Sequence, residues 1–154
     1  MRPWLIAVVI LLADQWTKAL VIASFLPGQS MPLLPPLVSL TYVQNTGAAF
    51  GLFKGQQTLF IVLSVLIIGW VAAELSTPPP KPLVGGWSYA LILGGAAGNL
   101  IDRARWGYVV DFIDLHVRPV FNVSDSAITI GVTLLVLHTL RPKQQATSNK
   151  QQVR

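Results

Sequence analysis

Five aspartates carry most of the chemistry that this sequence could perform. Asp14 interrupts the first apolar segment, and the other four fall within Gly94–Asp125, between two apolar segments. Two carboxylates held together in a low-dielectric setting cannot both ionise easily, so one keeps a proton while the other acts as a base. Such a pair can activate water for attack on an amide and protonate the leaving nitrogen. The acidic residues therefore predict aspartic-protease chemistry with no cofactor. The four are Asp102, Asp111, Asp114 and Asp125.

Two of the aspartates have a cation close by in the sequence. Asp14 and Lys18 are four residues apart, so they share a helix face and can pair. Arg103 directly follows Asp102, and a carboxylate beside an arginine tends to be ion-paired and structural. Both carboxylates are therefore expected to support a site rather than to react.

The remaining three aspartates have no local cation. Asp111 lies between two apolar residues, a setting that could raise its pKa, and Asp125 follows Asn122 by three residues. Spacing selects Asp125 with either Asp111 or Asp114 as the reactive pair. It does not separate Asp111 from Asp114.

The composition is that of a membrane protein. The 154 residues are 53% hydrophobic and 11% charged, whereas soluble domains carry about 25% charged residues. The basic residues behind the net charge of +5 are scattered, which favours membrane-topology charges over a nucleic-acid surface. The absence of cysteine excludes thiolate chemistry, and two isolated histidines do not predict a metal site.

The apolar segments predict a four-helix membrane bundle, that is, an all-α membrane protein. Roughly 20 apolar residues are needed to cross the hydrocarbon core of a bilayer. Residues 1–140 are expected to form a single domain, and the polar residues 141–154 a cytoplasmic tail. The expected helices cover about residues 4–26, 58–75, 83–104 and 120–140.

Two connecting segments are expected to lie outside the lipid. Prolines exclude a helix after residue 26, and the β-branched run Leu37–Gln44 predicts a strand that ends at the turn Asn45–Gly47, with Ala48–Phe53 as a returning strand. A small extracytoplasmic sheet over about residues 37–53 follows, since open sheet edges do not occur in lipid. Arg105–Pro119 is amphipathic and too short to span, which predicts a short interfacial helix.

Four spans place both termini on one side, and the basic residues at the chain ends make that side cytoplasmic. The acidic ends of the helices then face outward at one depth. Intramembrane acids often mark a proton or cation pathway, and transport is the alternative function. A pathway needs ionisable groups at several depths, so the single acidic layer favours a peptidase.

Five blocks of residues occur in the order seen in lipoprotein signal peptidase (signal peptidase II), and the chain resembles that family from Trp4 to Leu140. One departure is Ser124, where the family usually has alanine. The blocks are residues 14–18, 45–50, 94–103, 109–112 and 121–125, which read DQWTK, NTGAAF, GGAAGNLIDR, VVDF and FNVSD.

The resemblance implies an intramembrane aspartic endopeptidase of the bacterial cytoplasmic (inner) membrane, with its active site near the outer face. Its substrates would be diacylglyceryl-modified prolipoproteins, cleaved before the lipidated cysteine, with membrane lipid as the only other partner and no oligomer required. The family's catalytic pair maps onto Asp111 and Asp125, and Asp114 lies outside the motif. Supporting and substrate-binding residues implied by the resemblance are Asp14, Lys18, Asn45, Gly47, Asn99, Asp102, Arg103 and Asn122.

Overall fold

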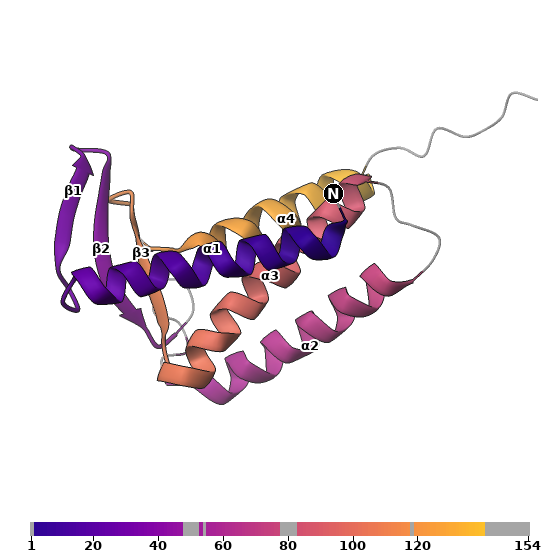
Figure 1. The fold of residues 1–154 in the computed structure, drawn as a ribbon, viewed down its shortest axis with the longest axis horizontal. Helices are drawn as coiled ribbons and strands as arrows, with labels where there is room; N and C mark the ends of the chain where they lie inside the picture. The colour runs from indigo at the N-terminus through magenta and orange to yellow at the C-terminus, as the bar shows by residue number, and fades with distance from the viewer. Residues whose placement is uncertain (1, 48–52, 54, 78–82, 118, 141–154) are drawn as a thin grey trace, which may run out of the picture.

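The computed structural model describes residues 2–47, 53, 55–77, 83–117 and 119–140. Within these residues four helices run side by side, and a small sheet closes one end of them, opposite the N-terminus (Figure 1). The helices are α1 (Pro3–Ser24), α2 (Gln57–Ser76), α3 (Leu83–Trp106) and α4 (Val123–Leu140), and the strands are β1 (Ser30–Leu34), β2 (Val38–Asn45) and β3 (Val109–Asp114).

The helix α3 is the centre of the bundle, because it packs against each of the other three helices. Its glycines allow this close approach. A Cβ atom at Gly94 would meet the backbone of Ala7 in α1, and one at Gly95 would meet the backbone of Ser124 in α4. The small-residue spacing seen in the sequence thus sets how closely α1 and α4 pack on α3.

Among the described helices, α1, α2 and α4 are long and apolar enough to cross a membrane. The chain is therefore a membrane protein. The fourth expected span, α3, has 24 residues, roughly 36 Å at 1.5 Å per residue. It is long enough to span, but its small and polar residues face other helices rather than lipid.

The sheet differs from the one expected in its first strand. β2 covers the predicted segment, but its neighbour is β1, which precedes it in the chain and pairs with it antiparallel. β1 was not predicted from the sequence because it contains Pro32, and proline is compatible with a strand only at a sheet edge. The expected return strand Ala48–Phe53 lies outside the described residues, apart from Phe53, which is in a turn.

The interfacial helix predicted for Arg105–Pro119 is wrong. α3 continues to Trp106, Gly107 turns the chain with a positive φ of 73°, and β3 then joins the far side of β2. The β-branched and aromatic residues of β3 fit a pleated surface, and the sheet pairs their backbone groups. This strand places Asp111 opposite Val43 of β2, at the end of the bundle.

Candidate active site

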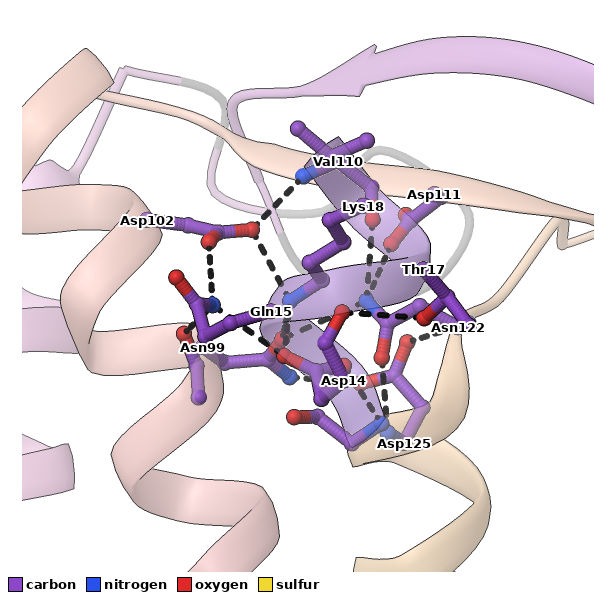
Figure 2. A network of polar contacts seen from close by, with 12 residues as sticks. Asp14, Gln15, Thr17, Lys18, Asn99, Asp102, Val110, Asp111, Asn122 and Asp125 are labelled. Atoms are coloured by element: carbon purple, nitrogen blue, oxygen red, sulfur yellow. Dashed lines mark hydrogen bonds and ion pairs between the residues drawn. The ribbon is translucent and has the colours of Figure 1, made fainter. Parts of the chain in front are cut away.

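Lys18 is the hub of a buried polar network (Figure 2). Its Nζ lies 2.8 Å from Asp14 Oδ2 and 2.8 Å from Asp102 Oδ2, and it donates to Asn99 Oδ1 at 2.9 Å. All four side chains are buried. The three N–H groups of the ammonium thus have three acceptors, as a buried cation requires. The expected Asp14–Lys18 pair is present, but among the described residues Asp102 pairs with Lys18 of another helix rather than with its neighbour Arg103.

The two carboxylates on Lys18 also hold the chain beside the proposed catalytic pair. Asp14 accepts the backbone N–H of Ser124 at 2.9 Å, and Asp102 accepts that of Val110 at 3.0 Å. Ser124 directly precedes Asp125, and Val110 directly precedes Asp111. Lys18 therefore connects the two short backbone segments that carry Asp111 and Asp125.

Asp111 is buried and held by two amides. Its Oδ2 accepts from Asn45 Nδ2 at 2.8 Å, and its Oδ1 accepts from Asn122 Nδ2 at 2.7 Å. Burial, together with the negative charge of Asp125, raises the pKa of Asp111 from its ordinary value of 3.8 to about 7, against the opposing effect of the two amides. Asp111 is thus suited to carry a proton near neutral pH.

Asp125 occupies the first turn of α4, where Asn122 caps the helix. The Asp125 backbone N–H donates to Asn122 Oδ1 at 2.9 Å, and the Asn122 backbone N–H donates to Asp125 Oδ2 at 3.3 Å. This reciprocal pair is a capping box. Asn99 Nδ2 donates to the other oxygen, Asp125 Oδ1, at 2.8 Å. The carboxylate is therefore fixed by α3 and by its own helix.

Fixed donors set which way the asparagine amides point. A carboxamide oxygen must face a donor, and its nitrogen then faces the opposite way. Asn45 Oδ1 accepts the Gly47 N–H at 3.0 Å, Asn99 Oδ1 accepts Lys18, and Asn122 Oδ1 accepts the Asp125 N–H. All three amide nitrogens consequently point at the two carboxylates, as Figure 2 shows for Asn99 and Asn122.

A pocket of about 740 Å³ opens on both carboxylates. The remaining predicted residues, Asp14, Lys18, Asp102 and Asn122, are buried behind it. The predicted set therefore divides into a pocket lining and a buried support. The predicted residues that line the pocket are Asn45, Gly47, Asn99, Arg103, Asp111 and Asp125.

Arg103 lies at the edge of this pocket, with its guanidinium 4.9 Å from the centre of the Phe60 ring. Within the described part of the chain, no hydrogen-bond acceptor or carboxylate is paired with it. Its charge still lies in the field of the aspartates of the site. Arg103 can therefore offer N–H donors to a bound molecule.

Asp114 lies apart from this group. It is three residues from Asp111 on the same strand, so its side chain points to the other face of the sheet. It accepts from Thr41 Oγ1 at 3.0 Å and from the His116 backbone N–H at 2.8 Å. The structure thus brings Asp111 together with Asp125 at the pocket, and leaves Asp114 outside it.

Two residues of the network were not predicted as site residues. Gln15 donates to Asp102 Oδ1 at 2.9 Å and to the Gly98 carbonyl at 3.2 Å, which links α1 to α3. Its place next to Asp14 was the available signal. Ser124 is fully buried, and its hydroxyl has no hydrogen-bond partner among the described residues. An alanine at this position would have no hydroxyl to leave unpaired.

Apolar helices that hold two carboxylates at an open pocket are typical of a helical membrane enzyme. The sequence profile described as "Signal peptidase (SPase) II" matches residues 6–141 of the chain. This chain belongs to the signal peptidase II family and is a peptidase. The transport alternative finds no support in this assignment.

The similar proteins cover nearly the whole chain. A lipoprotein signal peptidase of Moorella thermoacetica is 47% identical over 139 residues, which are 90% of this chain and 92% of the relative. The lipoprotein signal peptidase of Halothermothrix orenii is 42% identical over 88% of this chain and 92% of that protein. A solved structure described as a bacterial membrane enzyme, at 2.3 Å, is 31% identical with a TM-score of 0.88, covering 99% of this chain and 94% of its own.

Proposed function

We propose that this chain is an aspartic endopeptidase that removes the signal peptide of diacylglyceryl-modified prolipoproteins, cleaving before the lipidated cysteine. Asp111 and Asp125 are its catalytic pair. The observation that carries the proposal is the placing of these two carboxylates, each held by amide donors, on one pocket of a signal peptidase II family member. Relatives named lipoprotein signal peptidase supply the substrate class.

The pair shares one proton, and we assign it to Asp111, whose raised pKa lets it hold a proton near neutral pH. Asp125, as carboxylate, removes a proton from a water whose oxygen attacks the scissile carbonyl carbon. Asp111 gives its proton to the carbonyl oxygen, which yields a tetrahedral diol. When the diol collapses and the C–N bond breaks, Asp125 gives its proton to the leaving nitrogen and Asp111 takes a proton from a diol hydroxyl, so the pair again holds one proton.

The surrounding residues hold this chemistry in place. The amides of Asn45, Asn99 and Asn122 fix the carboxylates without adding charge, so the proton count of the pair stays free to change. Lys18 lies against the supporting aspartates, and within the described ranges of the chain neither Asp111 nor Asp125 has an ion pair of its own. Arg103 and the Asn45–Gly47 turn line the pocket, where they can bind the backbone or lipid ester of a substrate.

The proposed setting is the bacterial inner membrane, with four spans and both termini in the cytoplasm. The sheet end of the bundle, which carries the catalytic pair, then faces outward (Figure 1). Support comes from Arg2, which precedes α1 at the end of the bundle opposite the sheet, from the basic residues that follow α4 in the sequence, and from three apolar helices among the described residues. In this proposal a lipidated substrate reaches the site laterally from the bilayer. One copy of the chain is sufficient for cleavage.

The test is cleavage of one purified precursor in two forms, lipidated and unlipidated at the same cysteine. We expect the purified protein to release the signal peptide from the lipidated form, with the cysteine as the new N-terminal residue by mass spectrometry. The unlipidated form should be cleaved far more slowly. Cleavage at another bond, or equal cleavage of both forms, would contradict the proposed specificity.

A further inference from the structure

A second cavity, of about 530 Å³, lies between α2 and α4 with α3 as its floor. We call it the α2–α4 trough. It begins at Asn99, Arg103 and Asp125, which it shares with the first pocket, and so it reaches Asp125 of the proposed catalytic pair. Away from that end its wall is almost wholly apolar, and the lining residues there include Phe60, Ile67, Trp70, Ile128, Val132 and Leu135.

The arrangement of the helices leaves this trough open to the bilayer. Among the described helices, α2 packs extensively only against α3, and it lies apart from α1 and α4 in Figure 1. Ile67 and Trp70 of α2 and Val132 of α4 are 41%, 50% and 44% exposed. A hydrocarbon chain can therefore enter sideways, without leaving an apolar setting.

The length of the trough suits an extended chain. From Phe60 to Trp70 is ten residues, which is roughly 15 Å along α2 at 1.5 Å per residue. Both residues line the trough, so an extended acyl chain could lie against an apolar wall over this length.

Arg103 can provide a polar contact for a ligand at the end of the trough that adjoins the first pocket. Its guanidinium sits over the Phe60 ring, 4.9 Å from the ring centre, and both residues line the trough. Stacking on an aromatic ring orients a guanidinium while leaving its in-plane N–H groups available. A ligand with an ester carbonyl at its head and an apolar chain below it matches the order of these groups.

We propose that the α2–α4 trough binds one fatty acyl chain of the lipidated cysteine, with Arg103 donating to the ester carbonyl of that chain. This rests on the proposed function and extends it, because it assigns part of the substrate to one side of the catalytic pair. The lipid would then position the scissile bond, and the signal helix would lie outside the trough.

The test is steric, because bilayer and trough are equally apolar and chain length alone should have little effect. Two lipopeptides share one signal sequence. One carries long fatty acyl chains on its glyceryl group, and the other carries two acetyl groups, which keep the ester carbonyls. The variant Ser64→Trp narrows the trough from α2. Its kcat/KM should fall on the order of ten- to a hundredfold for the long-chain lipopeptide, as overpacking would require.

The acetylated lipopeptide is the internal control. Ser64→Trp should cleave it within about twofold of the wild-type rate, as expected of a substitution away from its contacts. Leu66→Trp places the same bulk on the outer face of α2, where Leu66 is 63% exposed, and should treat both lipopeptides like the wild type. Val132→Trp narrows the trough from α4 and should reproduce the selectivity of Ser64→Trp.

An equal loss on both lipopeptides would overturn the proposal, because it would mean that the trough holds the signal helix or a part common to both. Unchanged cleavage of the long-chain lipopeptide by both trough variants would also overturn it. Failure of the proposed function looks different, because the wild-type protein would then leave both lipopeptides uncleaved.

Discussion

Each catalytic aspartate of the proposed pair is held by neutral asparagine amides, and the backbone beside it is held by an aspartate that pairs with Lys18. Lys18 binds Asp14 and Asp102, and these carboxylates in turn hold the backbone beside Asp125 and Asp111. Removing Lys18 would leave both buried carboxylates without their cation, which is strongly destabilising. The support is therefore rigid, while the proton of the catalytic pair can still come and go.

The raised pKa of Asp111 predicts the pH dependence of cleavage. Below about 7 Asp111 keeps its proton and the pair is active, and as the pH rises through about 7 the proton is lost. We expect kcat/KM for a lipidated precursor to fall on this alkaline side. A pH profile that stays flat well above neutral would contradict the assignment of the proton to Asp111.

The same shift has a consequence for stability. The folded pKa of Asp111 lies above its ordinary value of 3.8, so the folded state binds more protons than the unfolded state between about 3.8 and 7. Asp111 therefore makes the protein less stable as the pH rises through that window. Asp111→Asn should remove this part of the pH dependence of Tm.

Contacts between residues close in the sequence could be predicted, whereas contacts between different helices could not. The Asp14–Lys18 pair follows from helix spacing, and it is present. Asp102 was assigned to adjacent Arg103, but its partner comes from another helix, which sequence distance does not reveal. Likewise, spacing could not choose between Asp111 and Asp114, because the choice depends on the alternation of side chains along a strand that was expected to be a helix.

Among the elements, α3 contributes both the packing and part of the site. At Gly98 an added Cβ would collide with the carboxylate of Asp14 and the hydroxyl of Ser124. The absence of a side chain is thus what lets α1 and α4 bring their polar groups together over α3. Gly69 in α2 offers a contrast, because nothing lies within 4 Å of a Cβ there.

This contrast predicts opposite effects of the same substitution. Gly98→Ala should lower the free energy of unfolding by about 1–3 kcal/mol through overpacking, and should also reduce cleavage by displacing Asp14. Gly69→Ala should leave stability unchanged or raise it by up to about 1 kcal/mol, since alanine is the better helix former. Thermal unfolding of the two purified variants measures both, and equal Tm values would contradict the packing role of Gly98.

Elements were predictable where apolar length defines them. The four helices lie close to their expected ranges, since long apolar runs carry a strong signal. The strands β1 and β3 were missed, because Pro32 argues against a strand and because Arg105–Pro119 has an amphipathic pattern that a helix would also show. Both strands depend on pairing with β2, which is a tertiary effect.

At the scale of the whole molecule, the proposal requires the two ends of the bundle to lie on opposite sides of the membrane. The sheet is at one end, and the C-terminus of α2 is at the other (Figure 1). The chain has no cysteine, so a single introduced thiol can report the side on which it lies. Ser30 in β1 and Thr77 at the end of α2 are both exposed and uncharged.

We expect a membrane-impermeant maleimide to label Ser30→Cys in intact cells. Thr77→Cys should react only after the membrane is opened, because it lies on the cytoplasmic side in the proposed topology. Neither substitution alters a topology-determining charge. Labelling of Thr77→Cys in intact cells, with Ser30→Cys protected, would reverse the proposed orientation and place the site on the wrong side for secreted substrates.

The central claim is that Asp111 and Asp125 form the catalytic pair, and single-turnover cleavage of a lipidated precursor by three purified variants tests it most directly. Asp111→Asn and Asp125→Asn should each abolish cleavage while the Tm near neutral pH is kept or raised. Asp114→Asn, the matched control outside the pocket, should retain most activity. Full activity in either of the first two variants, or a folded but inactive Asp114→Asn, would contradict the assignment.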